Sequence, residues 1–147
     1  MHSVLILWAP DSAENRRVID AITGAFDAAM LAPLAKKAIE ASIADITAAE
    51  IVVLGSQKTN SSDVPPDYTE FLRVFKGVTL AGRTAGLFSM GSEKSTGRLR
   101  RALKDTEILT MEEDPLFSDP KSGTPAEIAA WVKKLVAFHQ ESKNAHA

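Results

Sequence analysis

Short apolar runs alternate with helix-like segments along most of this chain. Residues 4–8 (VLILW) form a continuous apolar run, and Val18, Ile19, Ile22 and Phe26 then recur at roughly helical spacing. An apolar run of this length predicts a strand, and such spacing predicts a helix with one buried face. We therefore expect a strand followed by a helix at the start of the chain.

The two clearest strands lie at residues 51–55 and 84–90. IVVLG is apolar throughout and ends in glycine, and TAGLFSM is followed by a polar loop. Runs of this kind are typical of strands buried on both faces, as in the centre of a parallel sheet. Weaker apolar segments at residues 28–34 and 107–111 predict one further strand before this pair and one after it.

Helical patterns fill the gaps between these strands. We expect helices at residues 38–49, from Pro66 or Asp67 to Gly77, around residues 99–103, and at residues 124–138. The last helix has Thr124 as its N-cap and Pro125 in its first position. The tail ESKNAHA is expected to fray. One apolar face of the last helix consists of Ile128, Trp131, Val132, Leu135 and Phe138.

The order strand-then-helix, repeated about five times, predicts an α/β fold. Strands separated by helices need right-handed crossovers, which give a parallel sheet covered by helices on both faces. Such sheets bind ligands beyond the carboxyl ends of their strands. The loops at residues 9–16, 55–67 and 89–97 should therefore form one rim.

Composition narrows the classes of function. The chain has 147 residues with 45% hydrophobic content, which fits a single domain over residues 1–147. Its net charge of -2 argues against nucleic acid or an anionic membrane as a partner. The absence of cysteine excludes disulfides, thiolate metal sites and thiol catalysis. With no secretory leader and no apolar run of the ~20 residues that span a bilayer, a cytoplasmic protein is expected. The oligomeric state stays open.

Three stretches resemble the flavodoxin family. ILWAPDSAENRRVIDAI is similar to the family's first strand, phosphate loop and first helix, and AAEIVVLGSQKTN to its third strand and the loop that follows. GRTAGLFSMGSEKSTGRLRRAL is similar to the fourth strand and its Gly-rich loop. The resemblance runs from about Val4 to His139. It implies a three-layer sandwich with a five-stranded parallel sheet in order 2-1-3-4-5, noncovalent FMN, and a redox partner protein.

The resemblance also implies which residues line the cofactor site. The first loop would hold the phosphate with backbone N–H groups and hydroxyls at a helix N-terminus. The second and third loops would contact the isoalloxazine ring, Met90 supplying an apolar contact. The residues concerned are Asp11, Ser12, Ala13, Glu14 and Asn15, then Ser56, Gln57, Lys58, Thr59 and Asn60, and finally Ser89, Met90, Gly91 and Ser92.

The first loop departs from the family's pattern of hydroxyl, any residue, hydroxyl, Gly, Asn, hydroxyl. Ser12 is its only hydroxyl, and Pro10 has no N–H to donate. A carboxylate within ~5 Å of a phosphate costs roughly 3 kcal/mol per charge pair at an effective dielectric of about 20. Asp11 and Glu14 therefore oppose a phosphate, although both also fit an ordinary first helical turn capped by Ser12 or Asp11. Arg16 and Arg17 either offset the charge of these acids or are solvated.

The other loops leave similar alternatives open. Residues 55–64 and 89–97 contain no aromatic residue that could stack on a flavin, and Trp8 and Tyr68 are expected in the core. The third loop lacks the spacing of a P-loop. A basic cluster follows it, which is either a solvated helix face or a docking surface for an acidic partner. Its members are Arg98, Arg100, Arg101 and Lys104.

Other classes with similar patterns lack their key residues. A receiver domain would need an aspartate after the third strand, where Leu54-Gly55-Ser56 stands. A serine hydrolase would need Gly-x-Ser-x-Gly at a strand-to-helix elbow, which is absent. The histidines lie near the chain ends, and no metal site or catalytic residue is predicted.

Two interpretations of function remain from the sequence. In the first, a small FMN-binding electron carrier uses the flavin for its redox chemistry. In the second, a flavodoxin-like scaffold has lost its cofactor and acts as a binding or assembly module. Either is a carrier or a binding protein rather than a catalyst with its own active site. The sequence favours the first because of the polar second loop and the Gly-rich third loop, and the acidic first loop favours the second.

Overall fold

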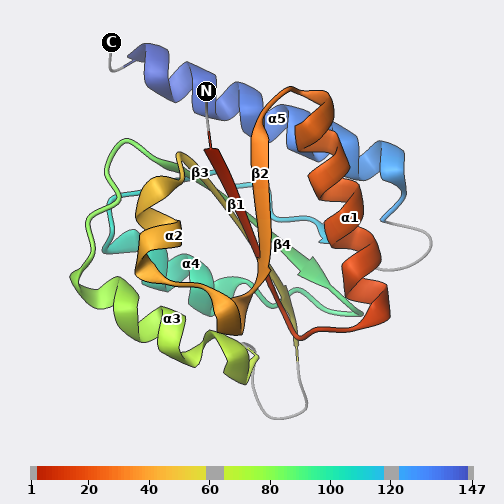
Figure 1. Ribbon diagram of the computed structural model, residues 1–147, viewed down its shortest axis with the longest axis horizontal. Coiled ribbons are helices and arrows are strands. Elements are labelled where there is room, and N and C mark those ends of the chain that lie inside the picture. The colour runs from red at the N-terminus through yellow and green to blue at the C-terminus, as the bar shows by residue number, and fades with distance from the viewer. Residues whose placement is uncertain (1–2, 59–64, 118–122, 146–147) are drawn as a thin grey trace.

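A computed structural model describes residues 3–58, 65–117 and 123–145 (Figure 1). The strands are β1 (Ser3–Ala9), β2 (Ala32–Lys37), β3 (Ile51–Gln57), β4 (Thr84–Met90), β5 (Leu109–Thr110) and β6 (Leu116–Phe117). The α-helices are α1 (Ala13–Ala28), α2 (Ile43–Ala48), α3 (Thr69–Val74), α4 (Gly97–Lys104) and α5 (Pro125–Ala145). Three short 3-10 turns are η1 (Ala38–Glu40), η2 (Pro66–Tyr68) and η3 (Phe75–Gly77).

The sheet is parallel and has the order β2-β1-β3-β4-β5, which confirms the predicted topology. β1 and β3 are central and almost entirely buried, because helices cover both of their faces. A sixth strand, β6, pairs with the carboxyl end of β4 at Ser89 and Met90. The edge beside β4 is therefore shared between two short strands.

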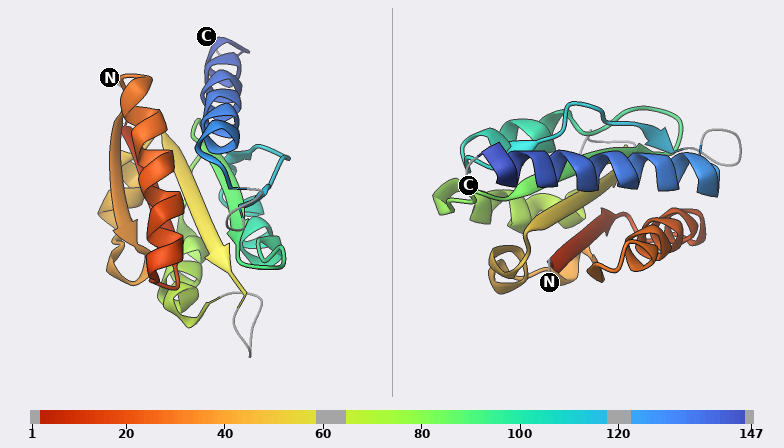
Figure 2. Two further views of the ribbon diagram at one scale, coloured as in Figure 1. Left: turned by 90° about the vertical axis from the view of Figure 1, so that its right-hand side faces the viewer. Right: turned by 90° about the horizontal axis from the view of Figure 1, so that it is seen from above.

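Helices cover the sheet on both faces, which confirms the three-layer sandwich. α1 and α5 lie on one side of the strands, and α2, α3 and α4 on the other (Figures 1 and 2). Alternate residues of β1 supply the two cores: Leu5 and Leu7 face the α2–α4 layer, and Val4 and Ile6 face α1 and α5. Because successive side chains of a strand point to opposite faces of the sheet, one strand contributes to both cores.

Several predicted boundaries were wrong in ways that local chemistry explains. The strand predicted at residues 28–34 begins only at Ala32, since α1 continues to Ala28 and ends where Met30 adopts φ 60°. The helix predicted at residues 38–49 is divided into η1 and α2. Ser42 starts α2 through a capping box, its side chain accepting from the Asp45 N–H while the Asp45 carboxylate accepts from the Ser42 N–H.

The end of the chain also differs from the prediction. The tail was expected to fray, but α5 continues to Ala145, and Lys143 Nζ pairs with Glu50 Oε1 at 2.8 Å. This contact joins the end of α5 to the turn before β3, at the end of the molecule where β1 begins (Figure 2). At the N-terminal end of α5, the Thr124 hydroxyl accepts a hydrogen bond from the Glu127 N–H at 3.2 Å, which confirms the predicted N-cap.

The last predicted strand, at residues 107–111, is shorter than expected. Glu107 has φ 66°, and only Leu109 and Thr110 pair with β4. The chain then leaves the sheet and returns as β6, which the sequence did not predict. In between, the Asp114 carboxylate accepts the Thr96 hydroxyl at 2.6 Å and lies 3.5 Å from Lys94 Nζ, so the detour anchors the third loop.

Candidate functional site

The three loops singled out in the sequence start from one edge of the sheet. β1, β3 and β4 run parallel, and Ala9, Ser56 and Ser89 stand in register across their carboxyl ends. This confirms that the described parts of the loops form one rim. Thr59 and Asn60 lie outside the described residues, and their predicted contacts with a flavin stay a prediction.

In the first loop, the Asp11 carboxylate is paired with neighbouring cations of the same chain. The Asp11 carboxylate accepts two hydrogen bonds from the Arg16 guanidinium, at 2.8 and 2.9 Å, and lies 3.7 Å from Lys37 Nζ. The hydrogen bond from Arg16 is the main reason that the pKa of Asp11 lies below its ordinary value. Arg16 is therefore paired rather than only solvated. Asp11 neutralises two cations that a phosphate would otherwise meet.

Ser12 caps α1, as expected if this loop is an ordinary start of a helix. Its hydroxyl oxygen accepts the Asn15 N–H at 3.1 Å. Ala13 and Glu14 follow as the exposed first positions of the helix. There the carboxylate of Glu14 is favoured by the helix dipole and would repel a second anion.

Asn15 connects the first loop to the second. Its side chain is buried, and the Nδ2 amide donates to Pro10 O at 2.8 Å and to Gln57 Oε1 at 2.9 Å. An amide nitrogen carries two hydrogens, so both donors of Asn15 are used inside the protein. The contact holds β1 and β3 together beyond the ends of their ladder.

A buried hydroxyl network joins the second and third loops. Ser95 Oγ donates to Ser56 O at 3.0 Å and lies 3.2 Å from Ser56 Oγ, while the Ser95 N–H donates to Ser89 Oγ at 2.8 Å. All three serines are buried. Ser95 was not among the predicted site residues, because nothing local distinguishes it from the other polar residues of SMGSEKSTG.

A second contact between the same loops is an exposed ion pair. Lys58 Nζ lies 3.0 Å from Glu93 Oε2. Glu93 was also missed from the sequence, since its partner is 35 positions away. The pair contributes little to stability because it is exposed, but it spans the gap between the two loops.

The remaining predicted residues of the third loop differ in exposure. Met90 is only 1% exposed and packs in the core, whereas Ser92 is exposed. Gly91 has φ 85°, and a Cβ there would lie 2.9 Å from the Gln57 side chain. Glycine is needed at this position because the backbone is left-handed and Gln57 packs directly against it.

A hollow of about 490 Å³ lies beside this rim. Glu14, Asn15 and Arg17 of α1 form one wall, and Gly91 and Phe117 belong to the opposite one. One acid and one base therefore face the same space. The aromatic residue that lines it is Phe117 of β6, which is only 3% exposed, and the lining residues of the third loop are not aromatic.

Trp8 lies at the end of β1 on the side of α1. It is 8% exposed, and its indole Nε1 is buried without a hydrogen-bond partner among the described residues. This confirms that Trp8 belongs to the core rather than to a stacking surface.

The donor set does not match what the phosphate of FMN needs. Such a group requires several N–H or hydroxyl donors pointing outward. Here Asn15 donates internally, Pro10 has no N–H, and Ser12 is the one hydroxyl of the loop. Glu14 adds a carboxylate at the same helix end. Whether the predicted residues bind a flavin in another way stays a prediction.

The basic cluster after the third loop has a partly structural role. Arg100 Nη2 donates to Met111 O at 3.3 Å and lies 3.6 Å from Asp114 Oδ2, so it supports the detour before β6. Arg98, Arg101 and Lys104 are exposed. Both interpretations of this exposed part, solvation and docking of an acidic partner, stay predictions.

His139 lies away from the three loops. His139 Nδ1 lies 2.8 Å from Thr84 Oγ1, at the opposite end of β4 from the loops. Among the residues that the structure describes, no three His, Cys, Asp or Glu side chains are grouped to hold a metal ion. No helix in the same part of the chain is both long and apolar enough to cross a bilayer.

The chain has a flavodoxin-like fold. It is similar to a short-chain flavodoxin associated with a non-canonical PDU bacterial microcompartment, at TM-score 0.81 and 14% identity over 95% of this chain and 99% of that one. It is also similar to oxidised flavodoxin 1 from Bacillus cereus, at TM-score 0.80 and 15% identity over 92% and 97%. No model of a protein family matches the sequence, and no curated protein matches it.

A third neighbour is a Fusobacterium nucleatum flavodoxin mutant bound to flavin mononucleotide, at TM-score 0.72 and 12% identity. This likeness covers 91% of this chain and 96% of that one. At such low identity the likeness defines the fold and does not extend to the cofactor.

Proposed function

We propose that this protein is a flavodoxin-like binding module that works without FMN. The proposal rests on one observation. Hydrogen bonds and an ion pair join the three loops at the rim where a flavin would enter. Asn15 joins Gln57, Ser95 joins Ser56, and Lys58 joins Glu93. A flavin ring inserted between these loops would have to break contacts that the chain already makes.

Charge supports the same conclusion. Asp11 pairs with two of the cations near the first loop, Arg16 and Lys37, and Glu14 lies at the helix end that would otherwise attract an anion. Removing one partner of a satisfied hydrogen bond costs about 1–3 kcal/mol when the other is buried. Breaking the Asn15 contacts would add that cost to the repulsion of the phosphate.

The test is a titration of the purified protein with FMN, followed by quenching of flavin fluorescence and by visible absorbance. We expect no saturable change up to high micromolar FMN. The Fusobacterium nucleatum flavodoxin, stripped of its flavin, is the positive control. Saturable binding within that concentration range would overturn the proposal.

An FMN-dependent electron carrier is the second candidate. The fold and the single rim formed by its three loops support it. If that candidate is correct, the titration saturates and bound flavin is reducible. A redox partner protein would then be expected as well.

A further inference from the structure

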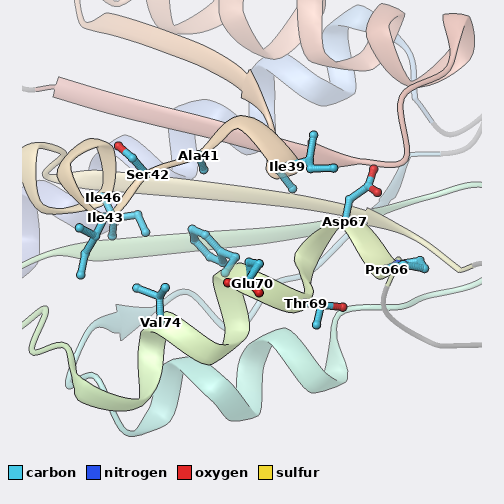
Figure 3. A pocket seen from close by; sticks show the side chains of 12 residues that line it. Ile39, Ala41, Ser42, Ile43, Ile46, Pro66, Asp67, Thr69, Glu70 and Val74 are labelled. Atoms are coloured by element: carbon cyan, nitrogen blue, oxygen red, sulfur yellow. The ribbon is translucent and has the colours of Figure 1, made fainter.

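An apolar groove lies between the η1–α2 segment and the η2–α3 segment (Figure 3). Its volume is about 480 Å³. Ile46 and Phe71 are buried at its floor, and Val74 points from α3 towards α2. The groove is thus formed by two segments, residues 38–48 and 66–74, that are separated in the sequence by β3 and the loop after it.

Two isoleucines at this groove are left open to solvent. Ile39 is 69% exposed and Ile43 is 50% exposed, whereas Ile46 one turn further along α2 is buried. Single exposed apolar residues are ordinary, but two that border a groove with an apolar floor mark a surface suited to docking. They project from the rim and do not enclose a cavity, which favours a protein surface over a small molecule.

The charged residues that line the groove are all acidic. Asp67 and Glu70 line it on the α3 side, and none of its described lining residues is Lys, Arg or His. Glu70 pairs with Arg73, which lies outside the groove in the cleft towards α4. Asp67 has no ion-pair partner among the residues that the structure describes. The groove is therefore apolar, and Asp67 leaves at its margin a negative charge that no described residue pairs with.

We propose that this groove binds an amphipathic helix of a partner protein, with Leu-like residues at i, i+4 and i+7 and Lys or Arg beside them. Such a helix places an apolar stripe in a groove while its flanking cations face the acidic margin. An anionic lipid surface would be repelled by the same carboxylates.

A second copy of this chain does not supply that helix from its described residues. α4 is the basic helix of the fold, but its apolar residues Leu99 and Leu103 are fully buried in its own core. The proposal therefore commits to a different protein as the occupant. This inference rests on the proposed function, and it assigns the binding surface of the module.

The experiment uses two labelled synthetic helical peptides of about 15 residues, or four turns, one patterned with Leu and Lys and the other with Leu and Glu. Fluorescence anisotropy measures their binding to the full chain. We expect saturable binding of the Leu/Lys peptide and at least about tenfold weaker binding of the Leu/Glu peptide. The double variant Ile39→Ser/Ile43→Ser should weaken the former at least about tenfold.

Two further variants distinguish binding in the groove from nonspecific attraction between opposite charges. Asp67→Asn/Glu70→Gln should weaken Leu/Lys binding and reduce its salt dependence. Leu109→Ser, at a 39% exposed leucine on the far edge of the sheet, is the control and should leave binding unchanged. Thermal melting checks that every variant is folded.

The proposal is overturned if neither peptide binds, if both bind equally, or if the isoleucine variant binds as tightly as the wild type. It is also overturned if the chain is a dimer that the isoleucine variant dissociates, because a second copy would then cover the groove. FMN titration of the same samples is independent. Flavin uptake would contradict the proposed function and leave a positive peptide result standing.

Discussion

Asp11 shows how one side chain changes the chemistry of the first loop. From the sequence its carboxylate is an obstacle to a phosphate, and in the structure it is also a partner for Arg16 and Lys37. The loop therefore does not hold a free acid beside a vacant anion site. It holds an ion-pair cluster in which Asp11 contacts Arg16 and also Lys37 at the end of β2.

Replacing Asp11 with Asn should lower the Tm at neutral pH. Because Arg16 lowers the pKa of Asp11 from 3.8, its carboxylate stabilises the fold above that value. This contribution is lost as the pH falls through the lowered pKa. The Tm difference between wild type and variant should therefore be present at pH 7 and vanish in strongly acid solution, as measured by thermal melting over a pH series.

Asp27→Asn is the matched control, since it removes the same charge from the exposed last turn of α1. It should not lower the Tm at pH 7, because the helix dipole disfavours a carboxylate in the last turn. Equal losses in the two variants, or a loss in Asp11→Asn that does not depend on pH, would contradict the assigned role of the Asp11–Arg16 pair.

At the scale of elements, α2 depends on its capping. The helix has only 6 residues, too few to be stable through its own hydrogen bonds. Ser42 and Asp45 satisfy one another's backbone N–H groups, and Asp45 Oδ2 also accepts from Lys36 Nζ at 2.9 Å. These contacts lower the pKa of Asp45, the Lys36 hydrogen bond being the largest cause, and they fix α2 against β2.

The variant Ser42→Ala should lower the free energy of unfolding by about 1 kcal/mol, because it removes the cap of α2. Urea denaturation measures this change. Ser92→Ala, which alters an exposed serine outside any helix, should change the free energy by less than about 0.5 kcal/mol. If Ser42→Ala also changed by no more than that, the cap would not stabilise α2.

At the scale of the whole molecule, Tyr68 joins the α3 layer to the sheet. Its hydroxyl is buried, donating to Gly55 O at 2.9 Å with Leu7 O at 3.2 Å, so it bridges the middle strands. Burial raises the pKa of this phenol far above its usual range, although the Gly55 hydrogen bond opposes the shift. The side chain should thus stay neutral for as long as the fold persists.

Alkaline titration tests this directly, because Tyr68 is the one tyrosine of the chain. A group whose pKa is raised on folding stabilises the protein below its unfolded value, here 10.0, and loses that contribution as pH rises. Phenolate absorbance should therefore appear together with loss of circular dichroism. Ionisation that precedes unfolding would contradict the burial. Tyr68→Phe, which keeps the ring, should cost about 1 kcal/mol at neutral pH.

The sequence predicted what depends on local periodicity. Uninterrupted apolar runs at β1, β3 and β4 indicated buried parallel strands, and helical spacing placed α1 and α5. It missed the boundaries that single residues decide, such as Met30 with its positive φ and the capping box at Ser42. It also missed β6, because a strand of two residues is too short to show an alternating pattern of apolar and polar positions.

By itself, the sequence determined the alternation of strands and helices, and hence a parallel sheet whose loops share one rim. These features follow from which residues are apolar and how they are spaced, because burial acts on each element through its own faces. Only the tertiary structure decided that Asn15 meets Gln57, that Lys58 meets Glu93, and that two isoleucines border a groove with α3. Those contacts join residues far apart in the chain, and no local pattern encodes which polar side chain will face another once the layers have packed.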